Sequence, residues 1–144
     1  VPYPDLAAER DILIKTTGFE LAKPSQVMGS AELITGQRLV SQVPVGETVA
    51  EAILNLVRSG RPETSNIDMV RDYVAWGPGP RASQAMLRAV RARAIMEGRL
   101  APSIDDLVAL AHPVLRHRMA LTFAARADGI TVENIINKLC ERIT

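Results

Sequence analysis

A short segment rich in glycine and proline carries the side chain with the clearest chemical potential. Residues 76–83 read Trp-Gly-Pro-Gly-Pro-Arg-Ala-Ser. Proline is favoured in the first turn of a helix, so Pro80 predicts a helix start with Arg81 in its first turn. A guanidinium offers a fork of donors to phosphate oxygens, and a helix N-terminus favours anions. The segment therefore indicates Arg81 as a phosphate-binding residue, although an arginine that only braces the turn fits the same pattern.

The other reactive side chains form no pattern typical of a catalytic or metal site. There is no G-x-x-x-x-G-K-[ST] loop to hold phosphates. His112 and His117 are five residues apart, on different sides of a straight helix, and Pro113 interrupts the segment between them. No carboxylate or second cysteine completes a ligand set, so we expect no metal. Cys140, the single cysteine, is expected to be a small apolar residue on a helix.

Composition favours one soluble helical domain. The chain has 144 residues, of which 47% are hydrophobic and only 3% aromatic, so its core must be aliphatic. A net charge of +1 argues against a dedicated nucleic-acid-binding protein. No apolar run is long enough to span a membrane, and a single cysteine fits a cytoplasmic location. The chain opens without an initiator methionine or signal peptide, and we expect it to be part of a longer protein.

Apolar periodicity and turn residues predict an all-α fold of about six or seven helices, with no sheet. The expected helices cover roughly residues 6–16, 31–42, 47–59 and 80–97, one between Ser103 and Pro113, and one after Thr131. Weaker signals indicate a helical turn around residues 67–73, a break or kink at Pro113, and a shorter helix that resumes over residues 113–119. Residues 120–130 are ambiguous.

These helices must bury a common set of aliphatic side chains to position Arg81. The predicted inner faces include Val49, Ile53, Leu56, Leu87, Val90, Leu107, Val108, Leu115, Ile135 and Leu139. The two N-terminal helices carry apolar stripes of their own, with Leu6, Leu13 and Ile14 on the first. On the second, Leu33, Ile34 and Val40 are expected to face inward. The sequence Ser103-Ile-Asp-Asp106 fits a capping box before an apolar run.

The segment Gly77-Pro-Gly-Pro-Arg-Ala82 resembles the sensor-2 motif of the MoxR family of AAA+ ATPases, which is typically Gly-x-Ser-Pro-Arg-Ala. Further segments follow in the family's order over residues 3–119. They are Tyr3-Pro4 with Glu9 and Ile12-Leu13, Glu32-Leu33 with Gln37, Val43-Pro-Val45, Leu56-Val57 with Arg58 or Arg61, Leu87-Arg-Ala-Val-Arg-Ala92, Gly98-Arg99, Ser103-Ile-Asp-Asp106 and Val114-Leu-Arg-His-Arg118. Gly79 departs from the usual serine, and residues 120–144 are less diagnostic.

The resemblance implies that residues 1–144 are the C-terminal helical lid of an ATPase whose core lies upstream. That core would hold the nucleotide loop, the metal-binding acidic residues and an arginine finger. The lid would close over ATP and Mg²⁺, with Pro80 at the nucleotide site and Arg81 as the sensor-2 arginine near the γ-phosphate. The whole protein would be a cytoplasmic, homo-hexameric chaperone for client maturation or metal-cofactor insertion, with a von Willebrand factor A domain protein as partner. The chain alone would bind no cofactor and catalyse nothing.

Two other functions remain open on the sequence. A nucleic-acid-binding module could use Arg81, Arg88, Arg91, Arg93 and Arg99, but near-neutral charge and few aromatics count against it; a steep salt dependence of affinity would identify it. A helical adaptor with no link to nucleotide is the second. A Walker A loop a domain's length upstream would exclude the adaptor.

Overall fold

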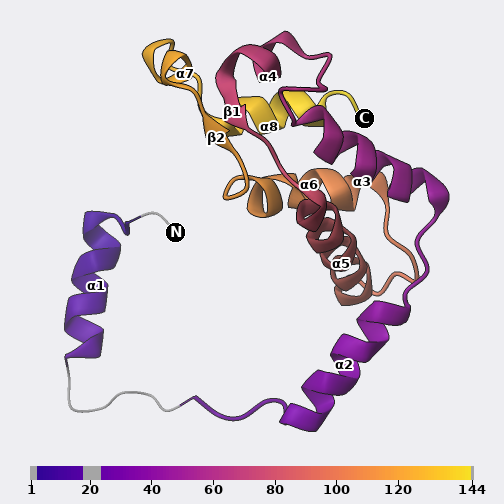
Figure 1. Ribbon diagram of the computed structural model, residues 1–144. Helices are drawn as coiled ribbons and strands as arrows, with labels where there is room; N and C mark the ends of the chain where they lie inside the picture. Colours follow the sequence, from indigo (N-terminus) through magenta and orange to yellow (C-terminus); the bar gives the residue numbers. More distant parts are fainter. Residues whose placement is uncertain (1–2, 18–23, 144) are drawn as a thin grey trace. The chain divides into compact units, whose positions relative to one another are not determined.

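The computed structural model describes residues 3–17 and 24–143 (Figure 1). This part of the chain contains eight helices and two very short strands. It divides into two compact units, residues 1–33 and 34–144. The predicted all-α class is therefore confirmed, with more helices than the six or seven expected and with a small sheet that was not expected.

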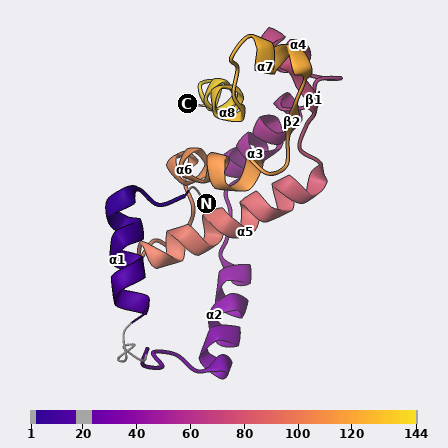
Figure 2. The ribbon, with the colours of Figure 1, turned by 90° about the vertical axis from the view of Figure 1, so that its left-hand side faces the viewer.

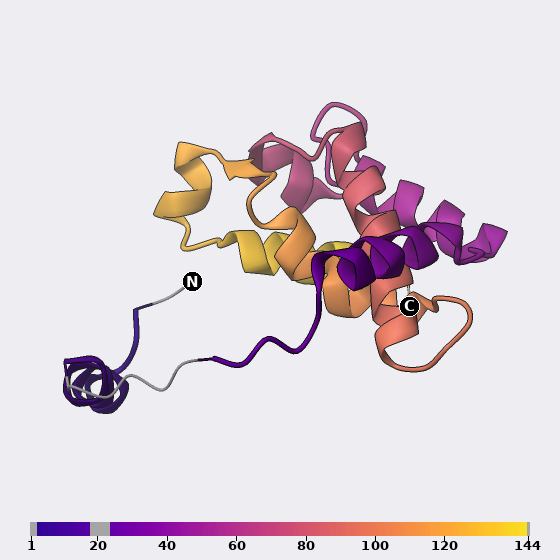
Figure 3. The same cartoon turned by 90° about the horizontal axis from the view of Figure 1, so that it is seen from below.

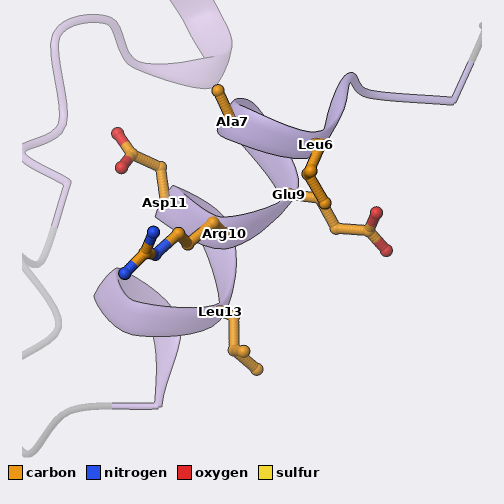
Figure 4. Close-up of a pocket in the computed structure, with 6 residues that line it drawn as sticks. All are labelled: Leu6, Ala7, Glu9, Arg10, Asp11 and Leu13. Carbon is orange, nitrogen blue, oxygen red and sulfur yellow. The ribbon is translucent and has the colours of Figure 1, made fainter.

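The first unit contains helix α1 (Leu6–Thr16), as predicted. Asp5 caps it, since its carboxylate accepts a 2.8 Å hydrogen bond from the Ala8 N–H. No described residue of α1 is buried. A hollow on its surface is lined by α1 residues alone, and Figure 4 shows their side chains pointing away from the helix in different directions, so no second described element walls a site there. Gly18, the glycine that the sequence offers as the end of this helix, lies outside the described residues.

Helix α2 (Ser30–Gln42) spans the boundary between the units. It begins at Ser30, one residue earlier than expected, and the Glu32 carboxylate accepts a 2.7 Å hydrogen bond from the Gly29 N–H. The predicted inward orientation is wrong for Leu33 and Ile34, whose exposed fractions are 53% and 49%, whereas Val40 is half-buried. Periodicity identifies an apolar face, but it cannot say whether the same chain covers that face.

The second unit holds the core. Its remaining elements are α3 (Glu47–Ser59), α4 (Asp68–Tyr73), β1 (Val74–Trp76), α5 (Pro80–Met96), α6 (Ile104–Leu115), β2 (Ala120–Leu121), α7 (Phe123–Ala127) and α8 (Val132–Cys140). Helix α6 lies between α5 and α8, and α3 also packs against all three (Figure 2). None of the described helices is both long and apolar enough to span a bilayer.

The core is aliphatic, as predicted. Most of the ten side chains expected inside are buried: Val49, Ile53, Leu56, Val90, Leu107, Leu115, Ile135 and Leu139. Leu87 is half-buried and packs against this core. Val108 is half-buried and lies outside the core cluster, because Asp106 rather than Val108 flanks Leu107 on the inner face of α6.

Two short strands connect parts of the unit that are distant in sequence. β1 and β2 pair antiparallel, with Val74 opposite Leu121 and Trp76 opposite Ala120. With α7 they project at one edge of the helical core (Figures 1 and 3). Of the predicted break or kink at Pro113, the break is wrong, since α6 continues through the proline to Leu115, and no separate helix forms over residues 113–119.

Candidate functional site

The turn before α5 is fixed against the end of α3. The Arg61 Nε donates a 2.9 Å hydrogen bond to the Pro78 carbonyl, which makes Arg61, not Arg58, the arginine that reaches this turn. A Cβ at Gly77 would lie 2.1 Å from the Gly60 carbonyl oxygen, so only glycine permits this approach. Pro78 is fully buried. The backbone that leads into α5 therefore has little freedom.

Arg81 lies where the sequence predicted it. Gly79 is the N-cap of α5 and Pro80 its first residue, which places Arg81 in the first turn. Ala82 and Met86 are buried at 1% and 0% exposed, so the helix stem is anchored in the core. The Arg81 side chain is exposed, and within residues 3–17 and 24–143 no ion pair is recorded for it. The backbone of Arg81 is thus held at a fixed place, and its guanidinium is available to an anion.

The glycine that departs from the family motif is tolerated because it is an N-cap. Gly79 has φ −85° and ψ −177°, a conformation open to any residue, and a Cβ there would meet nothing within 4 Å. We expect Gly79→Ser to stabilise the chain by about 0.5 kcal/mol, because serine caps a helix slightly better than glycine and restricts the unfolded chain. Chemical denaturation of the two chains measures this; a destabilised G79S chain would contradict it.

A hollow of about 590 Å³ opens beside Arg81. Its lining comes from the turn and from the segment after α6: Trp76, Gly77, Gly79, Pro80, Arg81, Ala82, His117 and Arg118. Two guanidiniums and an imidazole border it, and no carboxylate does. Together with the N-terminus of α5, this arrangement favours a ligand with several negative charges.

Sequence reasoning missed His117 and Arg118 as members of this site. They are brought to the turn by the pairing of Trp76 in β1 with Ala120 in β2. Strands of two and three residues have no periodicity to detect, so nothing in the sequence placed residue 118 near residue 81. His112 lies elsewhere, with its Nε2 2.8 Å from the Asn137 Oδ1. Among the residues that the structure describes, no group of His, Cys, Asp and Glu could hold a metal ion.

The other arginines that a nucleic-acid-binding module could use do not lie beside Arg81. Arg88 and Arg91 line a different hollow, between α2 and α5. Arg93 and Arg99 pair with Asp106. The basic residues therefore do not form one continuous strip along α5, which argues against the nucleic-acid-binding module.

Asp106 joins the end of α5 to the start of α6. Its carboxylate is 2% exposed and accepts hydrogen bonds from the Arg99 guanidinium at 2.6 and 2.7 Å and from the Ser103 N–H at 2.8 Å. The Arg93 Nε lies 3.1 Å from it. The Arg99 hydrogen bonds outweigh burial and lower the pKa of Asp106 to about 2. The predicted Ser103–Asp106 cap is confirmed, and its buried carboxylate is part of an ionic cluster with two half-buried arginines.

Comparison with known proteins now identifies the class. A family model described as the AAA lid domain matches residues 68–139, which is half of the chain, and the chain belongs to this family. It is similar to the chaperone MoxR1 of Mycobacterium tuberculosis, with 30% identity over 99% of this chain and 38% of MoxR1. It is also 30% identical to the uncharacterized protein YeaC of Bacillus subtilis, over 98% of this chain and 42% of YeaC. The resemblance to the MoxR family is thereby confirmed.

A solved structure supports the fold. The crystal structure of a putative ATPase from Cytophaga hutchinsonii matches with a TM-score of 0.86 and 20% identity, over 100% of this chain and 44% of that one. At this identity the match shows the fold alone. The chain spans less than half the length of each of these proteins.

Proposed function

We propose that residues 1–144 are the lid of a MoxR-type AAA+ ATPase that binds and hydrolyses ATP, with the ATPase core upstream in the same protein. Arg81 is the sensor-2 arginine that contacts the γ-phosphate, and Pro80 sets the helix start that presents it. The observation that carries this proposal is the exposed Arg81 in the first turn of α5, behind a turn that Arg61 and Gly77 fix against α3.

The chain supplies only part of what phosphoryl transfer requires. ATP hydrolysis needs a phosphate cradle, a Mg²⁺ site and a positioned water, and the upstream core would provide them. The carboxylate-free hollow with Arg81 fits the charge of a triphosphate. When ATP is bound, Arg81 would stabilise the negative charge that develops on the transferred phosphoryl group.

We further propose that the whole protein is a cytoplasmic chaperone that works as a homo-hexameric ring. Its role would be the maturation of client proteins or metal-cofactor insertion, with a von Willebrand factor A domain protein as partner. Similarity to MoxR1, a chaperone, over 99% of this chain supports this role. The apolar side chains that α1 and α2 leave exposed are consistent with a lid that meets further protein surface.

The test compares the full-length protein with residues 1–144 alone. We expect ATP turnover with Mg²⁺ from the full-length protein and none from the chain, which should also bind ATP weakly or undetectably by calorimetry. The reason is that one positioned arginine cannot replace the cradle and metal site. Turnover by the purified chain, after controls for contaminating ATPases, would contradict this. A full-length protein without turnover and without a Walker A loop would instead be a nucleotide-independent adaptor.

A further inference from the structure

A second arginine faces the hollow that Arg81 borders. Arg118 follows α6, 37 positions after Arg81, yet both guanidinium-bearing side chains line the same space of about 590 Å³. The link is the β1–β2 pairing, because β1 leads into the turn before α5 and β2 continues from the segment after α6 (Figure 1). The small sheet therefore joins two cationic segments at one site.

The contacts of Arg118 hold its side chain but leave its positive charge without a carboxylate partner in the part of the chain that the structure describes. Its Nη1 donates to the Val114 carbonyl at the end of α6 and contacts the His117 Nε2. Arg118 is half-buried, and among the described residues no ion pair with a carboxylate is recorded for it. Both recorded bonds use one nitrogen of a group that has five N–H donors. The remaining donors are available to a ligand, and the side chain is already oriented.

A comparison with Arg116 shows what sets Arg118 apart. Arg116 lies two residues earlier, is exposed, and has the Glu133 carboxylate 3.5 Å away. It does not line the hollow. Its charge thus has a partner within the fold, whereas Arg118 lines a space that no acidic residue borders.

We infer that Arg118 is a second phosphate-contacting arginine, which with Arg81 forms a two-guanidinium site for the terminal phosphates of ATP. This inference rests on the proposed function for its ligand. Two guanidiniums that border one space can hold separate oxygens of a polyphosphate, and a triphosphate offers more charge and more acceptor oxygens than a diphosphate. Arg118 should therefore contribute more to ATP affinity than to ADP affinity, while Arg81 acts mainly on turnover.

The test uses the full-length protein and measures the Kd of ATP and of ADP, together with kcat. We expect Arg118→Gln to raise the Kd of ATP about tenfold or more and that of ADP less, which is the effect of losing one charge-assisted hydrogen-bonded contact. Arg118→Lys should be intermediate, because an ammonium keeps the charge but loses the fork. Arg116→Gln is the matched control and should bind both nucleotides as the unmodified protein does.

Arg118→Gln also removes the bond to the Val114 carbonyl, so a second measurement avoids substitution altogether. Phenylglyoxal, which modifies exposed arginines, is applied to the unmodified full-length protein with and without a non-hydrolysable ATP analogue, and labelling is mapped by mass spectrometry. We expect the analogue to protect Arg81 and Arg118 but not Arg116.

The outcomes separate this inference from the proposed function. An unchanged ATP Kd in a folded Arg118→Gln protein, or an Arg118 that the analogue does not protect, overturns the inference even if Arg81 proves essential for turnover. A full-length protein that neither binds nor hydrolyses ATP overturns the proposed function, and the inference with it. Selective loss of ATP affinity with protection of Arg118 supports both.

Discussion

Asp106→Ala is expected to lower the free energy of unfolding of residues 1–144 by about 3 kcal/mol, which corresponds to a fall in Tm of about 10 °C. The substitution removes the acceptor of the Arg99 and Ser103 hydrogen bonds in a site that is 2% exposed. Loss of a cap contributes about 1 kcal/mol. Loss of the ion pairs contributes about 2 kcal/mol, less than in a fully buried pair, because the Arg93 and Arg99 side chains are 38% and 36% exposed and can be hydrated.

Two further variants separate the cap from the charge. Asp106→Asn keeps an oxygen that can accept from the Ser103 N–H but loses the charge, so it should destabilise by about 2 kcal/mol, the share of the ion pairs. Asp105→Asn is the control, since Asp105 is the exposed neighbour in the same turn. Denaturant titrations of the three variants measure these values. Equal stability of Asp106→Ala and Asp105→Asn would show that the cluster contributes nothing to folding.

The same cluster predicts how stability depends on pH. The pKa of Asp106 is lowered from 3.8 to about 2 in the folded chain, so its ionised form favours folding. This contribution, about 2 kcal/mol, is present above about pH 4 and is lost as the pH falls towards 2. The difference in stability between the unmodified chain and Asp106→Asn should therefore shrink when it is measured at pH 2.5 instead of pH 7.

The sequence predicted those parts of the fold in which a long apolar stripe follows a clear helix-start residue, such as a proline in the first turn or a capping serine. The start of α5 at Pro80 and the cap of α6 at Ser103 follow from local chemistry that needs no tertiary contact. Gly98, with φ +73°, ends α5 as expected of a glycine in the left-handed conformation. Arg81 could be placed for the same reason, because its position depends only on the turn and the helix start.

The errors have three physical causes. Pro113 lies inside α6 without ending it, because packing on both sides of the proline, at Ala111 and Leu115, holds the last turn in place. The stripes of α1 and α2 remain exposed because a sequence pattern marks an apolar surface but not its partner. Arg118 could not be found at all, since its place beside Arg81 depends on a strand pairing between residues 76 and 120 that is too short to leave a pattern.

Arg81→Ala in the full-length protein is expected to lower kcat for ATP hydrolysis by about 100-fold to 1000-fold. The loss of one preorganised donor at a reacting centre costs about 3–4 kcal/mol of transition-state stabilisation. The unfolding free energy of residues 1–144 should change by less than about 0.5 kcal/mol, since Arg81 is exposed and exposed charges contribute little to folding. Arg81→Lys should recover only part of the rate, because an ammonium does not reproduce the planar fork.

Arg88→Ala is the matched control for this experiment. Arg88 is also exposed on α5, about two turns after Arg81, but it lines a different hollow. Removing it changes the net charge of the helix equally, so a general electrostatic effect would lower the rate in both variants. A specific role predicts a loss in Arg81→Ala alone. The reverse result, in which Arg81→Ala unfolds the chain while the full-length protein keeps its ATP turnover, would make Arg81 a brace for the Gly77–Pro80 turn and remove the basis for a sensor arginine.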